Sequence, residues 1–97
     1  MRVVFVLLFL ACSCLAQGFA NHQDAFYKVC AYCHKPGGVA TPSMMDAADP
    51  AAIEDRAEAI RFVVRNGNYA MPAFRASEIS DKVLLELSLA LARGEFQ

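Results

Sequence analysis

Two cysteines and one histidine stand close together in the segment Cys30-Ala31-Tyr32-Cys33-His34. Thiols three residues apart lie about one turn apart on a helix, so both can form thioether bonds to the two vinyl groups of one haem. The adjacent His34 can then bring an imidazole nitrogen to the iron. The pattern predicts one covalently attached haem c per chain, held by Cys30 and Cys33, with His34 as an iron ligand.

Other uses of paired cysteines fit this sequence less well. A thioredoxin-like redox pair needs the strands and helix of a βαβ unit around it, and strand-like alternation is absent. A structural zinc site needs four ligands. Only His22 can join Cys30, Cys33 and His34, and the last two are neighbours that would have difficulty reaching one tetrahedral centre. A chance occurrence without function is the remaining alternative.

A second axial ligand is expected if the iron transfers electrons, because a filled coordination shell excludes substrates. Met71 stands in a predicted loop directly before Pro72, which prevents helix there and fixes the local backbone. A thioether sulfur favours ferrous iron and raises the reduction potential. Met44 and Met45 are rivals, but they follow His34 closely and are interpreted as core residues, the commoner role of methionine.

A second interaction of His34 points to Pro42. An iron-bound imidazole usually donates its other N–H to a carbonyl group, which fixes the orientation of the ring. The loop after His34 is well placed to provide this carbonyl, and Pro42 is the candidate. Alternatively, Pro42 only stiffens the loop.

Helix signals dominate the rest of the chain, which predicts an all-α domain of three main helices. The first is capped by Asn21, runs into the cysteine segment and is broken at 36–38; the second begins at 49–50 and ends at 66–67; the third runs from Ser80 to 93–94. The third helix carries Leu85 and Leu89 beyond one apolar stripe, either for tight packing or as an apolar contact patch for a partner.

The first 20 residues resemble a secretory signal peptide. A short positive start precedes the apolar run 3–11, and small residues near positions 16 and 20 offer cleavage sites. The run is too short for a stable membrane span, although an uncleaved anchor and a lipoprotein signal ending at Cys12 remain alternatives. Residues 21–97 then form the domain, which at fewer than about 80 residues needs a stabilising cofactor. The formal net charge of −1, without a basic stripe, speaks against nucleic-acid binding.

Taken together, these motifs resemble the class I cytochromes c, in which a first helix ends in C-x-x-C-H and a Met-Pro loop precedes the last helix. The resemblance covers essentially all of 21–97. Four segments look more narrowly like the cytochrome subunits of p-cresol methylhydroxylase and related 4-alkylphenol hydroxylases: Tyr27-Lys28-Val29-Cys30, Cys33-His34-Lys35-Pro36, Val63-Val64-Arg65-Asn66-Gly67 and Ala70-Met71-Pro72-Ala73-Phe74.

This resemblance implies a small class I cytochrome c fold wrapped around one haem. It also implies that the cytochrome docks on an FAD-containing subunit. In the family, that subunit dehydrogenates a 4-alkylphenol, and the cytochrome takes electrons from its flavin one at a time. The haem-attachment role carries over to Cys30 and Cys33, the axial roles to His34 and Met71, and the carbonyl role to Pro42. Thr41, where the family often has glycine, and Leu89, where many relatives have an aromatic residue, depart from the pattern and weaken the assignment of a particular partner.

The expected function is electron transfer by an exported, periplasmic bacterial protein that is not itself an enzyme. It would accept electrons from an FAD-containing flavoprotein subunit and pass them to a soluble redox protein. One alternative is a free periplasmic cytochrome that serves other dehydrogenases. Another is a haem sensor or peroxidase-like protein with Met71 unbound and an open iron site.

Overall fold

The computed structural model of the chain describes residues 18–35 and 46–96. Its elements follow in the order α2 (His22–Ala25), η2 (Phe26–Cys30), α3 (Ala31–His34), η4 (Pro50–Ala52), α4 (Ile53–Asn66) and α5 (Asp81–Ala92). No strand occurs among these residues, where a single bridge joins Asn68 and Met71. The all-α prediction is therefore confirmed for the described part of the chain.

The first helix is continuous from α2 through η2 to α3, and η2 is a π-helical segment. Its start is capped as predicted, since the Asn21 side chain accepts a hydrogen bond of 2.8 Å from the Asp24 backbone N–H. A π segment adds a residue to the turn and is frequent at functional sites. Here it ends at Cys30, directly before the turn that carries Cys33 and His34.

The second helix begins with the short 3₁₀ turn η4 and continues as α4. Pro50 occupies the first helical position as predicted. Asp49 stands at the cap position, but its side chain makes no capping hydrogen bond; its backbone carbonyl instead accepts from the Ala52 N–H at 2.8 Å. Gly67 ends α4 with a φ of 77°, as expected for a residue without a side chain.

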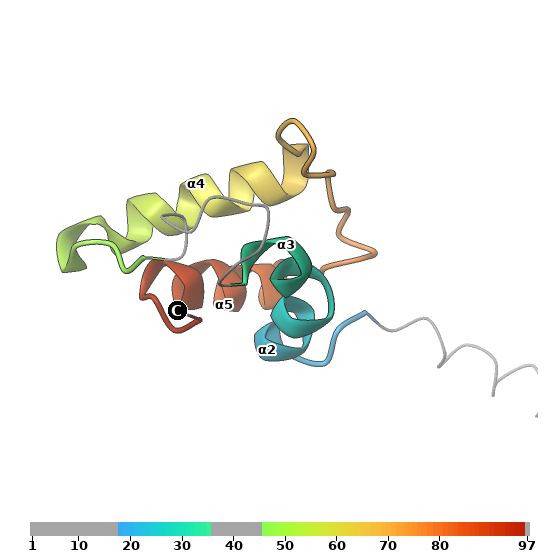
Figure 1. Cartoon of the computed structure of the whole chain (residues 1–97), viewed down its shortest axis with the longest axis horizontal. Helices are drawn as coiled ribbons and strands as arrows, with labels where there is room; N and C mark the ends of the chain where they lie inside the picture. Colours follow the sequence, from blue (N-terminus) through green and yellow to red (C-terminus); the bar gives the residue numbers. More distant parts are fainter. Residues whose placement is uncertain (1–17, 36–45, 97) are drawn as a thin grey trace, which may run out of the picture.

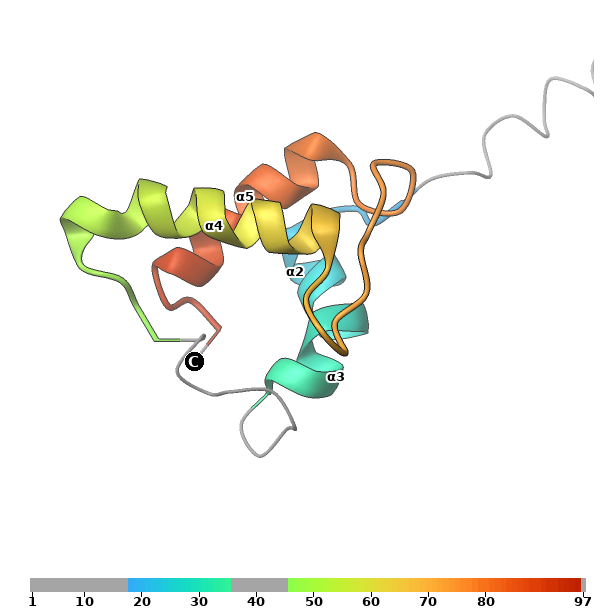
Figure 2. The same cartoon turned by 90° about the horizontal axis from the view of Figure 1, so that it is seen from above.

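Helix α5 forms the centre of the packing, with α4 and α2 both against it (Figures 1 and 2). Ser80 caps it by accepting a hydrogen bond of 3.2 Å from the Val83 N–H. The core cluster joins residues of all three helices and of the connection before α5: Ala25, Phe26, Val64, Ile79, Val83, Leu84 and Leu87. Each large side chain among these contributes roughly 1.5–3 kcal/mol by leaving water.

The turn after α5 returns to the first helix. Phe96 stacks on Phe26 with ring centroids 4.0 Å apart, and the rings of His22 and Tyr27 meet Phe96 edge-on. His22 stands at the start of α2, where a solvated side chain is expected, yet its side chain is only 19% exposed and lies 3.7 Å from Glu86 and 3.9 Å from Glu95. The physical reason is the return of the chain end over α2, which helix patterns in the sequence do not indicate.

Most of the predicted signal peptide, residues 1–17, lies outside the described residues, and the division at residue 20 stays a prediction. None of the helices that the structure describes is long and apolar enough to cross a membrane. Leu85 of the last helix is 46% exposed and Leu89 is half-buried. Tight packing within the domain therefore does not fully explain the apolar residue at position 85.

Candidate functional site

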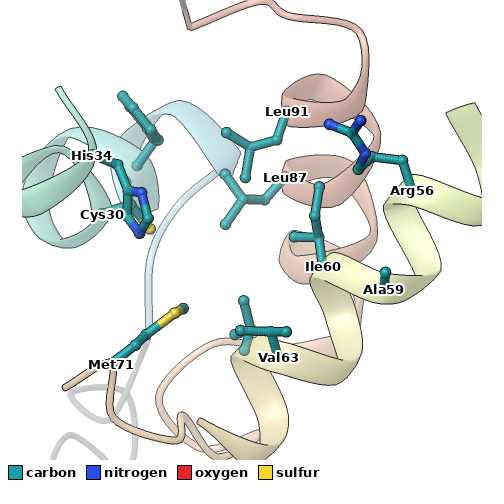
Figure 3. Close-up of a pocket in the computed structure, with 11 residues that line it drawn as sticks. Cys30, His34, Arg56, Ala59, Ile60, Val63, Met71, Leu87 and Leu91 are labelled. Carbon is teal, nitrogen blue, oxygen red and sulfur yellow. The ribbon is translucent and has the colours of Figure 1, made fainter. Parts of the chain in front are cut away.

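An apolar pocket lies between the first helix on one side and helices α4 and α5 on the other (Figure 3). Its empty volume is about 660 Å³, including the part open to solvent. Most of the lining is aliphatic or aromatic, from Phe26, Ala59, Ile60, Val63, Val64, Leu87 and Leu91. Cys30, His34, Met71 and Arg56 complete it. A cavity of this size and character suits a large, flat, apolar cofactor with a few polar attachment points.

Three of the four residues predicted to hold the haem meet in this pocket. Cys30 and His34 reach it from the first helix, and Met71 reaches it from the connection after α4, with its thioether pointing inward (Figure 3). Cys33, the fourth, is exposed and is not part of the lining. It lies three residues after Cys30, directly before His34.

The connection that carries Met71 is held in a tight turn. The backbones of Asn68 and Met71 exchange two hydrogen bonds, of 3.0 and 2.9 Å. Tyr69 between them has a φ of 52° and is fully exposed. Past the turn, the Phe74 N–H donates to the Val64 carbonyl at 2.8 Å, so both sides of Met71 are tied down. These backbone hydrogen bonds position Met71, so that its thioether is directed into the pocket.

Burial gives Cys30 a character unlike that of a redox cysteine. Removal from water raises the pKa of its thiol to about 11, so the thiol is neutral at physiological pH. Reactive cysteines in thiol–disulfide enzymes have lowered pKa values and a nearby positive charge or helix N-terminus. The thioredoxin-like alternative therefore loses support.

The Nδ1 atom of His34 is buried and has no hydrogen-bond partner among the described residues. A buried ring nitrogen of this kind needs an acceptor or a metal. The acceptor predicted from the sequence, the carbonyl of Pro42, lies outside the described residues, as do Thr41, Met44 and Met45. His22 points elsewhere, and no three His, Cys, Asp or Glu side chains within 18–35 and 46–96 gather to hold a metal ion by themselves. The donor set and the apolar pocket thus fit a haem better than zinc.

Comparison with known proteins shows the family to which the chain belongs. The family described as cytochrome c oxidase, cbb3-type, subunit III matches residues 17–88. The chain belongs to this family of c-type cytochromes. Its cofactor is accordingly a covalently bound haem c, and the expected cytochrome c fold is confirmed.

Two individual proteins are similar to this cytochrome. The 4-cresol dehydrogenase [hydroxylating] cytochrome c subunit of Pseudomonas putida is 36% identical over 70 residues, which are 72% of this chain and 57% of that protein. The cytochrome therefore spans little more than half the length of that relative. A chain in the crystal structure of p-cresol methylhydroxylase is 34% identical and superimposes with a TM-score of 0.54, over 76% of this chain and 93% of that one.

The sequence patterns did not single out Arg56, which is the only arginine among the described residues that line the pocket. A signal was present, because Arg56 stands four residues before Ile60 and seven before Val63, the spacing of one helix face. An arginine on an otherwise apolar helix face was overlooked because charged residues are usually assigned to solvent.

Proposed function

We propose that this cytochrome is an electron-transfer subunit that accepts electrons from an FAD-containing flavoprotein and passes them to a soluble acceptor, without catalysing a reaction on a substrate. Cys30 and Cys33 attach the haem, His34 and Met71 are its axial ligands, and the Pro42 carbonyl accepts from the second nitrogen of His34. The observation that carries this proposal is the meeting of Cys30, His34 and Met71 in one apolar pocket.

The haem iron supplies one-electron redox chemistry when bound. The chain's own residues set its conditions. With the imidazole of His34 and the sulfur of Met71 both bound to the iron, no position would remain for a substrate, and the soft sulfur would favour the reduced state. The aliphatic lining from α4 and α5 excludes water, which lowers the local dielectric constant and helps to set the reduction potential.

The proposed partner follows from the relative in Pseudomonas putida, which is named as the cytochrome c subunit of a 4-cresol dehydrogenase. A flavoprotein that oxidises a 4-alkylphenol is accordingly the proposed electron donor. Native purification of the exported protein, followed by flavin analysis of what co-purifies, tests this assignment. Purification of a haem protein without any flavin-containing chain would favour a free cytochrome that serves several dehydrogenases.

Export to the periplasm completes the proposal, with cleavage near residue 16. Phe19 packs against the core, and the Ala20 N–H donates to Asp24 at 3.2 Å, so cleavage after residue 20 would remove both contacts. The intact mass of the mature holoprotein tests the site of cleavage. A mass that corresponds to a chain beginning at Asn21 would contradict cleavage near residue 16.

Replacement of Met71 by alanine tests the axial assignment. The oxidised holoprotein should lose the far-red absorption band of a sulfur–iron bond, become high-spin and bind carbon monoxide when reduced. Met44→Leu and Met45→Leu are the controls and should keep the band. If the wild-type protein already binds carbon monoxide readily, the open-site sensor or peroxidase-like function is favoured instead.

A further inference from the structure

Within residues 18–35 and 46–96, Arg56 is the one arginine whose side chain lines the pocket, and it comes from the first turn of α4 (Figure 3). The residue is half-buried. Every other lining residue from α4 and α5 is apolar. A guanidinium group carries a full positive charge at physiological pH, and a charge placed against an apolar surface is costly unless an anion accompanies it.

No hydrogen bond or ion pair of the Arg56 side chain occurs within the described residues, whereas the two other arginines of α4 are both engaged. Arg61 donates to the Ser88 hydroxyl at 2.9 Å. Arg65 donates to Asp81 at 2.7 Å and to the Phe74 carbonyl at 3.2 Å. Among the three arginines of α4, the lack of a partner is therefore particular to Arg56, the one that lines the pocket.

The surroundings of Arg56 on its own helix offer no anion. Side chains three and four residues away are the neighbours on a helix surface, and here they are Ala52, Ile53, Ala59 and Ile60. The acidic residues of the first turn, Glu54 and Asp55, are exposed. The positive end of the helix dipole also lies at this turn and disfavours a cation. Helix stability therefore does not explain an arginine at position 56.

We infer that Arg56 binds a propionate carboxylate of the haem. This inference rests on the proposed placement of the haem in the pocket. Haem is apolar except for its iron and its two propionates, so the single guanidinium in an apolar lining is matched in chemistry to one of them. The planar fork of arginine pairs with a carboxylate through two parallel hydrogen bonds, which a lysine cannot reproduce.

Such a pair has two consequences that can be measured. A cation near the iron disfavours the oxidised state, which carries one more positive charge, so loss of Arg56 lowers the reduction potential. An opposite charge also keeps a carboxylate ionised, so without Arg56 the propionate takes up a proton at a higher pH. The potential then falls with rising pH across that titration. Cys30 and His34 are the other titratable groups among the described lining residues. Both are proposed to hold the haem, so neither is expected to cause this pH dependence.

Potentiometric titration of the holoprotein between about pH 5 and pH 8, around the ordinary range of carboxyl and imidazole groups, tests the inference. The wild type should show a nearly constant potential. Arg56→Gln should have a lower potential at the upper end and a potential that depends on pH. Arg56→Lys should fall between the two, because it keeps the charge and loses the fork. Arg93→Gln removes the same charge from an exposed site after α5 and should match the wild type in pH profile.

A potential and pH profile of Arg56→Gln equal to those of Arg93→Gln, with the far-red band intact, would overturn the inference and leave the proposed function standing. Should the glutamine variant fail to retain haem, NMR titration of the wild-type propionates decides. Two propionates that both titrate as free carboxylic acids would overturn the inference, while one held ionised would support it. Failure of the proposed function is recognised separately, by wild-type protein that lacks covalent haem or the far-red band.

Discussion

Gly67 lies directly against the backbone of Met71, so that a Cβ atom at position 67 would be 2.9 Å from the Met71 carbonyl oxygen and 3.0 Å from the Ala73 nitrogen. Gly67 also has a φ of 77°, which other residues rarely adopt. The end of α4 and the proposed axial ligand are thus in contact through backbone alone. We predict that Gly67→Ala lowers the free energy of unfolding by more than about 1 kcal/mol and weakens the bond from Met71 to iron.

The far-red band and carbon monoxide binding of the holoprotein report on that bond, and denaturant titration reports on stability. Ser77→Ala, at an exposed position of the same connection, is the matched control and should change neither. A Gly67→Ala protein with an unchanged band would show that the turn at 68–71 adapts without moving the sulfur of Met71.

Arg65 ties the connection after Met71 to both helices beside it. It donates to the Phe74 carbonyl and forms an ion pair with Asp81, whose side chain is 92% exposed. An exposed ion pair contributes below about 1 kcal/mol, whereas a hydrogen bond from a charged donor contributes about 1.5 kcal/mol or more. We therefore predict that Arg65→Ala destabilises the protein clearly more than Asp81→Asn does, as measured by urea unfolding. Equal losses in the two variants would assign the whole effect to the ion pair.

The three helices and the capped ends of these helices were predictable because their sequence signals are local. Asn21 and Ser80 cap as expected, and Gly67 ends α4. These residues act within one turn of the backbone that they stabilise, so the sequence contains the whole interaction. The position of Met71 in a connection between helices was predictable for the same reason, since Pro72 disfavours helix there; its role as an iron ligand stays a prediction.

The remaining features depend on contacts between distant segments. The π segment at Phe26–Cys30 has no local signal in the sequence. Ser88 of α5 is fully buried, accepts a hydrogen bond from Arg61 and donates one to the Leu85 carbonyl, both at 2.9 Å. The role of Arg56 could not be read from the sequence either, because the sequence does not show which face of α4 meets the pocket. Only the packing of α4 on α5 decides such cases.

Phe96 illustrates a long-range contact with a measurable contribution. Its ring stacks on Phe26 and is met edge-on by Tyr27, which anchors the turn after α5 to the first helix. Phe96→Ala should lower the free energy of unfolding by about 2 kcal/mol, less than for a fully buried phenylalanine because the residue is half-buried. Phe62→Ala is the control: this ring is 67% exposed, so its loss should stay within about 0.5 kcal/mol. Similar losses in both variants would contradict the anchoring role.

Asp24 makes the start of the first helix sensitive to acid. The hydrogen bond from the Lys28 side chain, at 2.8 Å, and the bond from the Ala20 N–H hold the pKa of the Asp24 carboxyl below its ordinary value. A carboxyl whose pKa is lower in the folded state stabilises the fold above its unfolded pKa, and this stabilisation is lost as the pH falls through the folded value.

Stability should therefore decline below about pH 4, the ordinary range of an aspartate, and Asp24→Asn should remove part of that decline. Urea midpoints of the holoprotein on both sides of this pH measure the effect. Lys28→Gln should reduce the same acid dependence, because it removes the largest cause of the lowered pKa while leaving the Ala20 bond in place. An acid dependence unchanged by either substitution would mean that other carboxyl groups control the loss of stability.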